Sequence, residues 1–180
     1  MNDNTVIQVL KGILDSGLLA RLSTAIVTRQ SYQPTQQGVP VEPSLFIHKI
    51  NATRYGFPGN ESAYNSVNDN FDTTERIWVT PTFQISALAQ QDPTNLSLPT
   101  ASDIVETAAD IMQSAATQAT LLQSNINIIR VESIPISYFI NEKDRHEQEP
   151  SFEIELSYLR EFTTTTPKVN DFRESGIFGV

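Results

Sequence analysis

Residues 76–89 read RIWVTPTFQISALA, and from Ile77 onward the side chains alternate between an apolar face and a mixed one. A period of two predicts a long β-strand with one dry face. The residues of this dry face are Ile77, Val79, Pro81, Phe83, Ile85, Ala87 and Ala89. Because Pro81 has no amide hydrogen to donate, the strand must lie at a sheet edge or carry a bulge at that residue.

A helix follows this strand after a loop that contains Pro93 and Pro99. Thr100 and Asp103 form a variant of the capping box, which marks a helix N-terminus. Beyond them, apolar residues recur every three or four positions and predict one long helix, over about residues 100–124, that covers the sheet. Its apolar stripe consists of Ile104, Val105, Ala108, Ile111, Met112, Ala115, Ala116, Ala119 and Leu122.

The N-terminal part of the chain predicts a helix, a strand and a long loop. Residues 5–22 have the pattern of a first helix, with Asn4 as its cap and Gly17 as its stop. Residues 45–55 predict a second strand. Residues 56–74 are polar, rich in Asn and without a period, and a structureless loop of this length is usually functional or ordered by a partner.

The C-terminal part predicts more strands, a charged hairpin and a tail. Residues 126–138 and 152–158 have strand patterns, and the second has one dry face and one acidic face. Residues 141–149 between them are nearly all charged, so we place them at the tip of a hairpin that projects into solvent or towards a charged partner. Residues 163–180 open with four Thr, show no period and predict an extended arm.

Together these elements predict an α+β fold. It consists of a mostly antiparallel sheet covered by one long helix, with an N-terminal helix, a long β-hairpin and an extended C-terminal arm. Residues 1–162 are expected to form a single domain, and residues 163–180 the arm.

The composition excludes several classes of function. The chain has no cysteine, which rules out thiolate catalysis and cysteine-ligated metals. Its formal charge of −9 repels phosphate, although this sign suits a surface past which DNA slides without sticking. No apolar run approaches the roughly 20 residues of a membrane span, and the N-terminus lacks a secretory pattern. The protein is expected to act where it is made or to leave without a signal.

No catalytic, cofactor or metal site emerges from the residues. The fingerprints of acyl transfer, nucleotide hydrolysis and hydride transfer are missing. His146 lacks the spacing of metal ligands, which favours a solvated hairpin tip, and His48 reads as a core or interface histidine. Glu153 and Glu155, about 7 Å apart on one strand, indicate a wet face rather than a glycosidase pair. The protein is therefore not expected to be an enzyme.

A set of segments resembles the phage neck or tail terminator family, whose members are also called gateway proteins. The segments are ERIWVTPTFQISALA at 75–89, QQDPTN at 90–95, TASDIVETAADIMQS at 100–114, TRYGFP at 53–58, Ile128 to Val131, Tyr138-Phe139, Asp144-Arg145, EPSF at 149–152 and Glu155-Leu156. They follow the order of the family and span most of residues 45–160. Their specificity lies in the ordered set rather than in any one motif.

The resemblance implies a structural protein of a tailed phage virion. Such a protein forms a ring, a hexamer, at the head–tail junction, where it caps the tail tube and lets DNA pass through its channel. The implied partners are further copies of the chain, portal-side or adaptor-side neck proteins and the tail tube protein, with no specific DNA binding and no membrane. The protein would be made in the host cytoplasm. Expected inter-subunit or partner contacts are Tyr55, Phe57, Glu142, Asp144, Arg145, Glu147, Phe172, Ile177 and Phe178.

Two other functions stay open from the sequence. A head-side joining or adaptor protein, or a tail-tube protein, of the same virion would share the small α+β domain, the acidic surface and the ring symmetry. A carbohydrate-binding module is suggested by Tyr55, Phe57, Tyr64 and Trp78, although aromatic side chains more often serve in packing.

Overall fold

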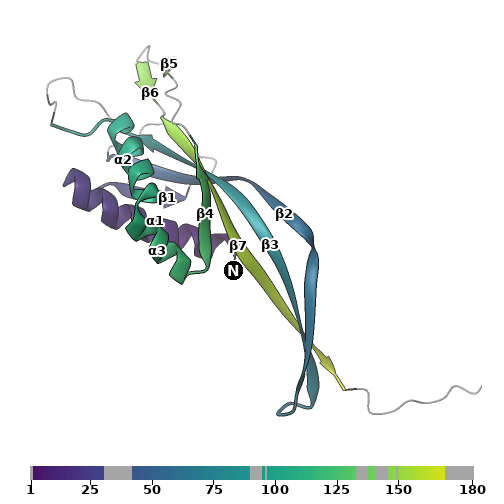
Figure 1. Cartoon of the computed structure of the whole chain (residues 1–180). Coiled ribbons are helices and arrows are strands. Elements are labelled where there is room, and N and C mark those ends of the chain that lie inside the picture. The colour runs from purple at the N-terminus through teal and green to yellow at the C-terminus, as the bar shows by residue number, and fades with distance from the viewer. Residues whose placement is uncertain are drawn as a thin grey trace, which may run out of the picture.

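The computed structural model describes residues 2–30, 42–89, 95, 97–132, 138–140, 146–148 and 150–168. Five strands form one mixed sheet in the order β1-β2-β3-β7-β4, and the helices pack together on one end of it (Figure 1). The strands are β1 Val27–Gln30, β2 Ser44–Asn65, β3 Asn70–Leu88, β4 Ile126–Val131 and β7 Ser151–Pro167. β1 is parallel to β2, whereas the other neighbouring pairs are antiparallel. The α+β class and the mostly antiparallel sheet are confirmed.

The dry face predicted for β3 forms the centre of the core. Val79, Phe83, Ile85 and Ala87 are buried, and β3 lies between β2 and β7. The buried apolar and aromatic residues of these two neighbours are Leu45, Ile47, Phe152, Ile154, Leu156 and Tyr158. The alternation of the sequence thus identified the helix-covered face of β3 and β7, but not that of β2.

Pro81 lies in a central strand, so the edge-strand alternative is wrong. β2 shifts its register between Lys49 and Asn51, close to the Pro81 pair with Ala52. On the other side, pairing between β3 and β7 passes from Val79 directly to Thr82, without a pair at Pro81. A missing amide donor is tolerated there because the ladder is already interrupted.

Helix α1, Asp3–Leu22, begins earlier than predicted and continues past its expected stop. Asn2 is the N-cap, since its side-chain oxygen accepts from the backbone amide of Thr5 at 2.9 Å. Gly17 lies inside the helix, where an added Cβ would come within 2.8 Å of Ile111 on helix α2, Ala101–Gln113. The sequence therefore holds a glycine at this position for the close approach of two helices and not to end one.

The predicted long helix is two helices, α2 Ala101–Gln113 and α3 Ala115–Gln123. The capping box of Thr100 and Asp103 is present. Ser114 has an extended backbone and caps α3 by accepting from the Thr117 amide, which offers the chain an alternative to continued helix. Because of this break, the buried face of α3 differs from the predicted one. Thr117 and Leu121 are buried, whereas Leu122, which was predicted to be buried, is 57% exposed. Ala115, Ala116 and Ala119, also assigned to the stripe, are exposed.

Residues 56–74 are not a structureless loop. They are the far half of a long hairpin in which β2 and β3 stay paired up to Asn65 and Asn70. β7 follows β3 to Pro167, so residues 163–167, assigned above to the C-terminal arm, are strand. The prediction failed here because the strand pattern was sought as alternating burial, and these residues include none that is buried on either face.

The region of the predicted charged hairpin contains a second, two-stranded sheet. β5, Tyr138–Ile140, pairs antiparallel with β6, His146–Gln148. Most of the predicted tip, residues 141–145 and 149, lies outside the described residues.

Candidate assembly surface

Three strands of the sheet extend beyond the helices as a narrow three-stranded element, which we call the ribbon. It comprises residues 52–65 of β2, 70–78 of β3 and 159–167 of β7. Figure 1 shows the ribbon leaving the helix-covered end of the molecule, with no helix on either of its faces. Residues 52–64 and 160–167 are all exposed. A sheet of this kind lacks the buried face that normally stabilises three strands, so it offers two faces to partners.

Strand register assigns the ribbon's side chains to two faces. The inner face continues the buried face of the sheet, because it alternates outward from Val79 and its partner Tyr158. Tyr64 and Phe71 pair on this face, with their ring centroids 5.4 Å apart. The outer face carries a row across all three strands, in which Tyr55 pairs with Trp78 and Trp78 with Leu159.

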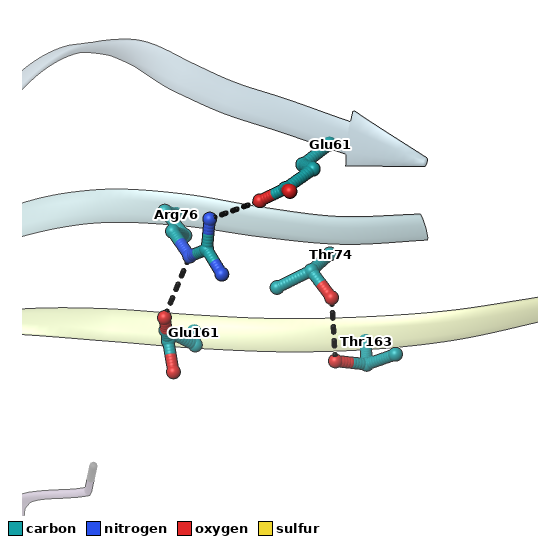
Figure 2. Close-up of polar contacts among 5 residues, drawn as sticks. All are labelled: Glu61, Thr74, Arg76, Glu161 and Thr163. Carbon is teal, nitrogen blue, oxygen red and sulfur yellow. Dashed lines mark hydrogen bonds and ion pairs between the residues drawn. The ribbon is translucent and has the colours of Figure 1, made fainter. Parts of the chain in front are cut away.

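An ion-pair network on the outer face links the three strands, as Figure 2 shows. Arg76 on β3 donates to Glu161 on β7 at 2.7 Å and to Glu61 on β2. The hydrogen bond to Glu161, followed by that to Glu61, raises the pKa of Arg76. Next to it, the hydroxyls of Thr74 and Thr163 lie 3.1 Å apart. Exposed ion pairs add little to the free energy of unfolding. We therefore infer that the main effect of this network is to fix the register of the three strands.

A second set of polar contacts holds the tip of the ribbon. Asn65 accepts from the backbone amide of Val67 at 3.1 Å, which forms the turn between β2 and β3. Tyr64 donates its hydroxyl hydrogen to Asp69 at 2.5 Å, and Lys168 approaches the same carboxylate at 3.3 Å. The hydrogen bond from Tyr64, then that from Lys168, lowers the pKa of Asp69.

The segment YGFPG, residues 55–59, forms an irregularity in β2. Tyr55 pairs with Trp78 and Gly59 with Arg76, so residues 56–58 lie opposite a single residue of β3. Gly56 has a φ of +69°, a conformation that side chains disfavour. Phe57 is 98% exposed and Tyr55 is 59% exposed. Both predicted contact residues therefore lie on the surface of the ribbon, at its β2 edge.

Among the residues whose side chains the structure describes, every large aromatic side chain that is exposed lies on the ribbon. These residues are Tyr55, Phe57, Tyr64, Phe71, Trp78 and Phe162. Sequence reasoning placed Phe71 in a loop and did not single out Phe162. The signal for Phe162 was available, because it follows Tyr158 at even spacing along the same strand face.

Of the other predicted contact residues, only the backbone of Glu147 is described. Glu142, Asp144, Arg145, Phe172, Ile177 and Phe178 lie outside the described residues. Glu147 lies in β6, where its backbone pairs with that of Phe139. Their role in contacts stays a prediction.

The described residues contain no arrangement for metal chemistry. No group of three or more His, Asp or Glu side chains among them could hold a metal ion. His48 is exposed, so the core alternative for this residue is wrong. Glu155 lies 3.7 Å from Arg130 on the neighbouring strand. None of the helices in these segments has the length and apolar character to cross a membrane.

Comparison with known proteins adds a family and a fold. A family model described as E217 gateway protein gp29 matches residues 5–168. The chain is also similar to a solved structure, the PVC sheath/tube terminator of an extracellular contractile injection system in its extended state. The TM-score is 0.51 at 8% identity, and the similarity covers 100% of this chain but 65% of that one. Among proteins with curated descriptions, none matches this chain.

Proposed function

The chain belongs to the E217 gateway protein gp29 family, and from this membership we propose that it is the tail or neck terminator of a tailed phage, a structural protein of the head–tail junction. The family match spans the helices, the sheet and the ribbon, so the proposal concerns the whole described fold. The similarity of fold to a sheath/tube terminator supports it. The role is structural and not catalytic.

In this proposal the protein acts as a ring of copies, a hexamer, that caps the tail tube. Its neighbours are the tail tube protein on one side and portal-side or adaptor-side neck proteins on the other. DNA passes through the channel without specific binding, for which a charge of −9 on every copy is suited because it repels phosphate. The protein is made in the host cytoplasm and functions in the virion.

The ribbon is the observation that carries this proposal. Six aromatic side chains are exposed on strands with no covered face, and burying them against a neighbouring protein is favourable. A ring between other rings has several neighbours, and each neighbour can cover part of this surface.

Electron microscopy of purified virions, with antibody labelling of this protein, tests the proposal. We expect label in one place, at the end of the tail next to the head. Label along the whole tail would contradict it in favour of a tube protein, and label on the portal side only would favour a head-side joining protein. Binding of the monomeric protein to a glycan array, with no label on virions, would favour a carbohydrate-binding module.

A further inference from the structure

The ribbon begins at a short segment that we call the root. The root comprises residues 55–58 of β2, 77–78 of β3 and 159–160 of β7. Three features that hold the sheet together change at this segment, and the first is burial. Val79 and Tyr158 are the last buried residues of β3 and β7 before the ribbon, whereas the neighbouring Trp78 is 50% exposed. Full burial of the sheet therefore ends where the root begins.

The second feature is the number of paired strands. The pairing of β4 with β7 ends at Tyr158. β2 and β3 pair as far as Tyr55 and Trp78, and their pairing resumes at Gly59 and Arg76. Of the strand pairs that the structure describes, only β3–β7 runs through the root without interruption. A sheet of four paired strands thus narrows at the root to a single ladder of backbone hydrogen bonds.

The third feature is the distribution of polar contacts between side chains. In the described part of the chain, no side-chain hydrogen bond or ion pair links the strands within the root, and the nearest on the core side run from Lys49 and Tyr158 to Asp3. Towards the tip, by contrast, such contacts follow one another closely, as Figure 2 shows for part of them. They join Arg76 to Glu61 and Glu161, Thr74 to Thr163, Ser62 to Thr73, and Asp72 to Asn65 and Thr165.

These three changes give the ribbon a cross-linked body and a weakly held base. Local stability follows the density of contacts, so the root is expected to deform before the ribbon does. Hinges consist of a few residues whose backbone angles absorb the motion, and glycine tolerates the widest range of such angles. Gly56, with its φ of +69°, lies in the interrupted segment of β2.

We propose that the root is a hinge, about which the ribbon moves as one rigid unit relative to the helix-covered part of the molecule. The inference goes beyond the proposed function and does not depend on it, because it follows from contacts within one copy. In an assembly such a hinge allows the exposed faces of the ribbon to meet a neighbour at more than one angle.

Distances between pairs of spin labels test the hinge, since the chain has no cysteine and each pair can be introduced alone. The hinge pair is Glu106→Cys on α2 with Val67→Cys at the ribbon tip. The ribbon pair is Asn60→Cys with Val67→Cys, and the core pair is Glu106→Cys with Asn127→Cys. All four positions are exposed. An excess of unlabelled wild type removes distances between copies.

We expect a broader distribution of distances for the hinge pair than for the ribbon pair and the core pair. The ribbon pair controls for local motion at the tip, which would broaden both distances that involve Val67. A hinge pair as narrow as the core pair would overturn the proposal. A ribbon pair as broad as the hinge pair would also overturn it, because the ribbon would then not move as a unit.

Deletion of Phe57 and Pro58 tests the position of the hinge. It leaves Gly56 opposite Ile77, so that β2 and β3 can pair one to one through the root. We expect a narrower distribution for the hinge pair and slower hydrogen exchange of the Ile77 amide. The matched control, Phe57→Ser with Pro58→Ala, changes the same side chains at constant chain length and is expected to stay as broad as the wild type.

A deletion variant with the circular dichroism spectrum of the wild type and an equally broad hinge pair would overturn the assignment of the hinge to the root. If the deletion prevents folding, the three label pairs in the otherwise unchanged chain decide the proposal. The labelling of virions decides the terminator role separately, so the failure of one proposal is distinguishable from the failure of the other.

Discussion

Two glycines of α1 have opposite surroundings. This difference determines whether substitution by alanine raises or lowers the stability of the protein. A Cβ at Gly12 meets nothing within 4 Å, whereas one at Gly17 lies 2.8 Å from Ile111. Gly12→Ala is expected to stabilise the protein by about 0.5–1 kcal/mol, the helix propensity difference. Gly17→Ala gains the same propensity but overpacks the interface at a cost of about 1–3 kcal/mol, so it is expected to destabilise. Urea unfolding of both variants measures the change in the free energy of unfolding. A change in the same direction for both would contradict the close approach of α1 and α2.

Asp3 ties the start of α1 to the sheet where the ribbon begins. Lys49 donates to its carboxylate at 2.7 Å and Tyr158 donates at 3.2 Å. The hydrogen bond from Lys49 is the main cause that lowers the pKa of Asp3 below 3.8, against the opposing effect of burial. A carboxyl whose pKa is lower in the folded protein stabilises the fold above its unfolded pKa, and this contribution is lost as the pH falls through the folded pKa.

Asp3→Asn is therefore expected to lower the melting temperature at about pH 7, and this difference from the wild type is expected to shrink as the pH falls through the lowered pKa of the folded protein. Differential scanning calorimetry over this range measures the effect. Lys49→Met should produce a similar loss, and combining both changes should add less than their sum because they remove one interaction. A difference that stays constant down to the lowest pH would contradict the ion pair.

The strands of the ribbon hold together without a core, so polar contacts between them have more influence on local order than on global stability. Arg76→Met removes the bridge from β3 to Glu61 and Glu161. We expect faster amide hydrogen exchange at residues 59–65 and 160–166, with nearly unchanged exchange in Phe83 and Ile85, which are fully buried. Arg76→Lys keeps one charge contact and should give an intermediate rate. Unchanged exchange in the ribbon would show that backbone pairing alone sets its order.

At the scale of the whole molecule, the folded core and the assembly surfaces occupy separate parts of the chain. The core lies under α1, α2 and α3, whereas the exposed aromatics lie on the ribbon. Changes at assembly surfaces should therefore alter the oligomer while leaving the monomer folded.

A deletion of residues 171–180 tests the same separation in the C-terminal arm. The apolar residues Phe172, Ile177 and Phe178 of this segment are predicted contacts. We expect the shortened protein to melt as the wild type does but to assemble more weakly, because the apolar side chains of a predicted contact are stabilised when a neighbour covers them. Sedimentation velocity measures the assembly. Unaltered assembly would remove the tail from the interface, and a lowered melting temperature would place it in the monomer's fold.

Local pattern was enough to identify the elements that bury one face. The alternation of residues 77–89 and 152–158, the spacing of Ile104 to Met112 and the box at Thr100 all correspond to observed features. In each case burial or capping depends on residues a few positions apart, so the chain alone carries the information.

Two features depended on contacts between distant residues. Gly17 serves an approach to Ile111, and the ribbon exists because β3 pairs with β2 and β7 over residues that no core covers. The break at Ser114 is local, because its cap is the Thr117 amide, but the continuous apolar spacing of the sequence concealed it. Backbone pairing can hold a strand whatever its side chains are, so the ribbon leaves no apolar period in the sequence. The same pairing places Phe57 and the other exposed aromatics on one projecting ribbon, which no reading of neighbouring residues could have assembled.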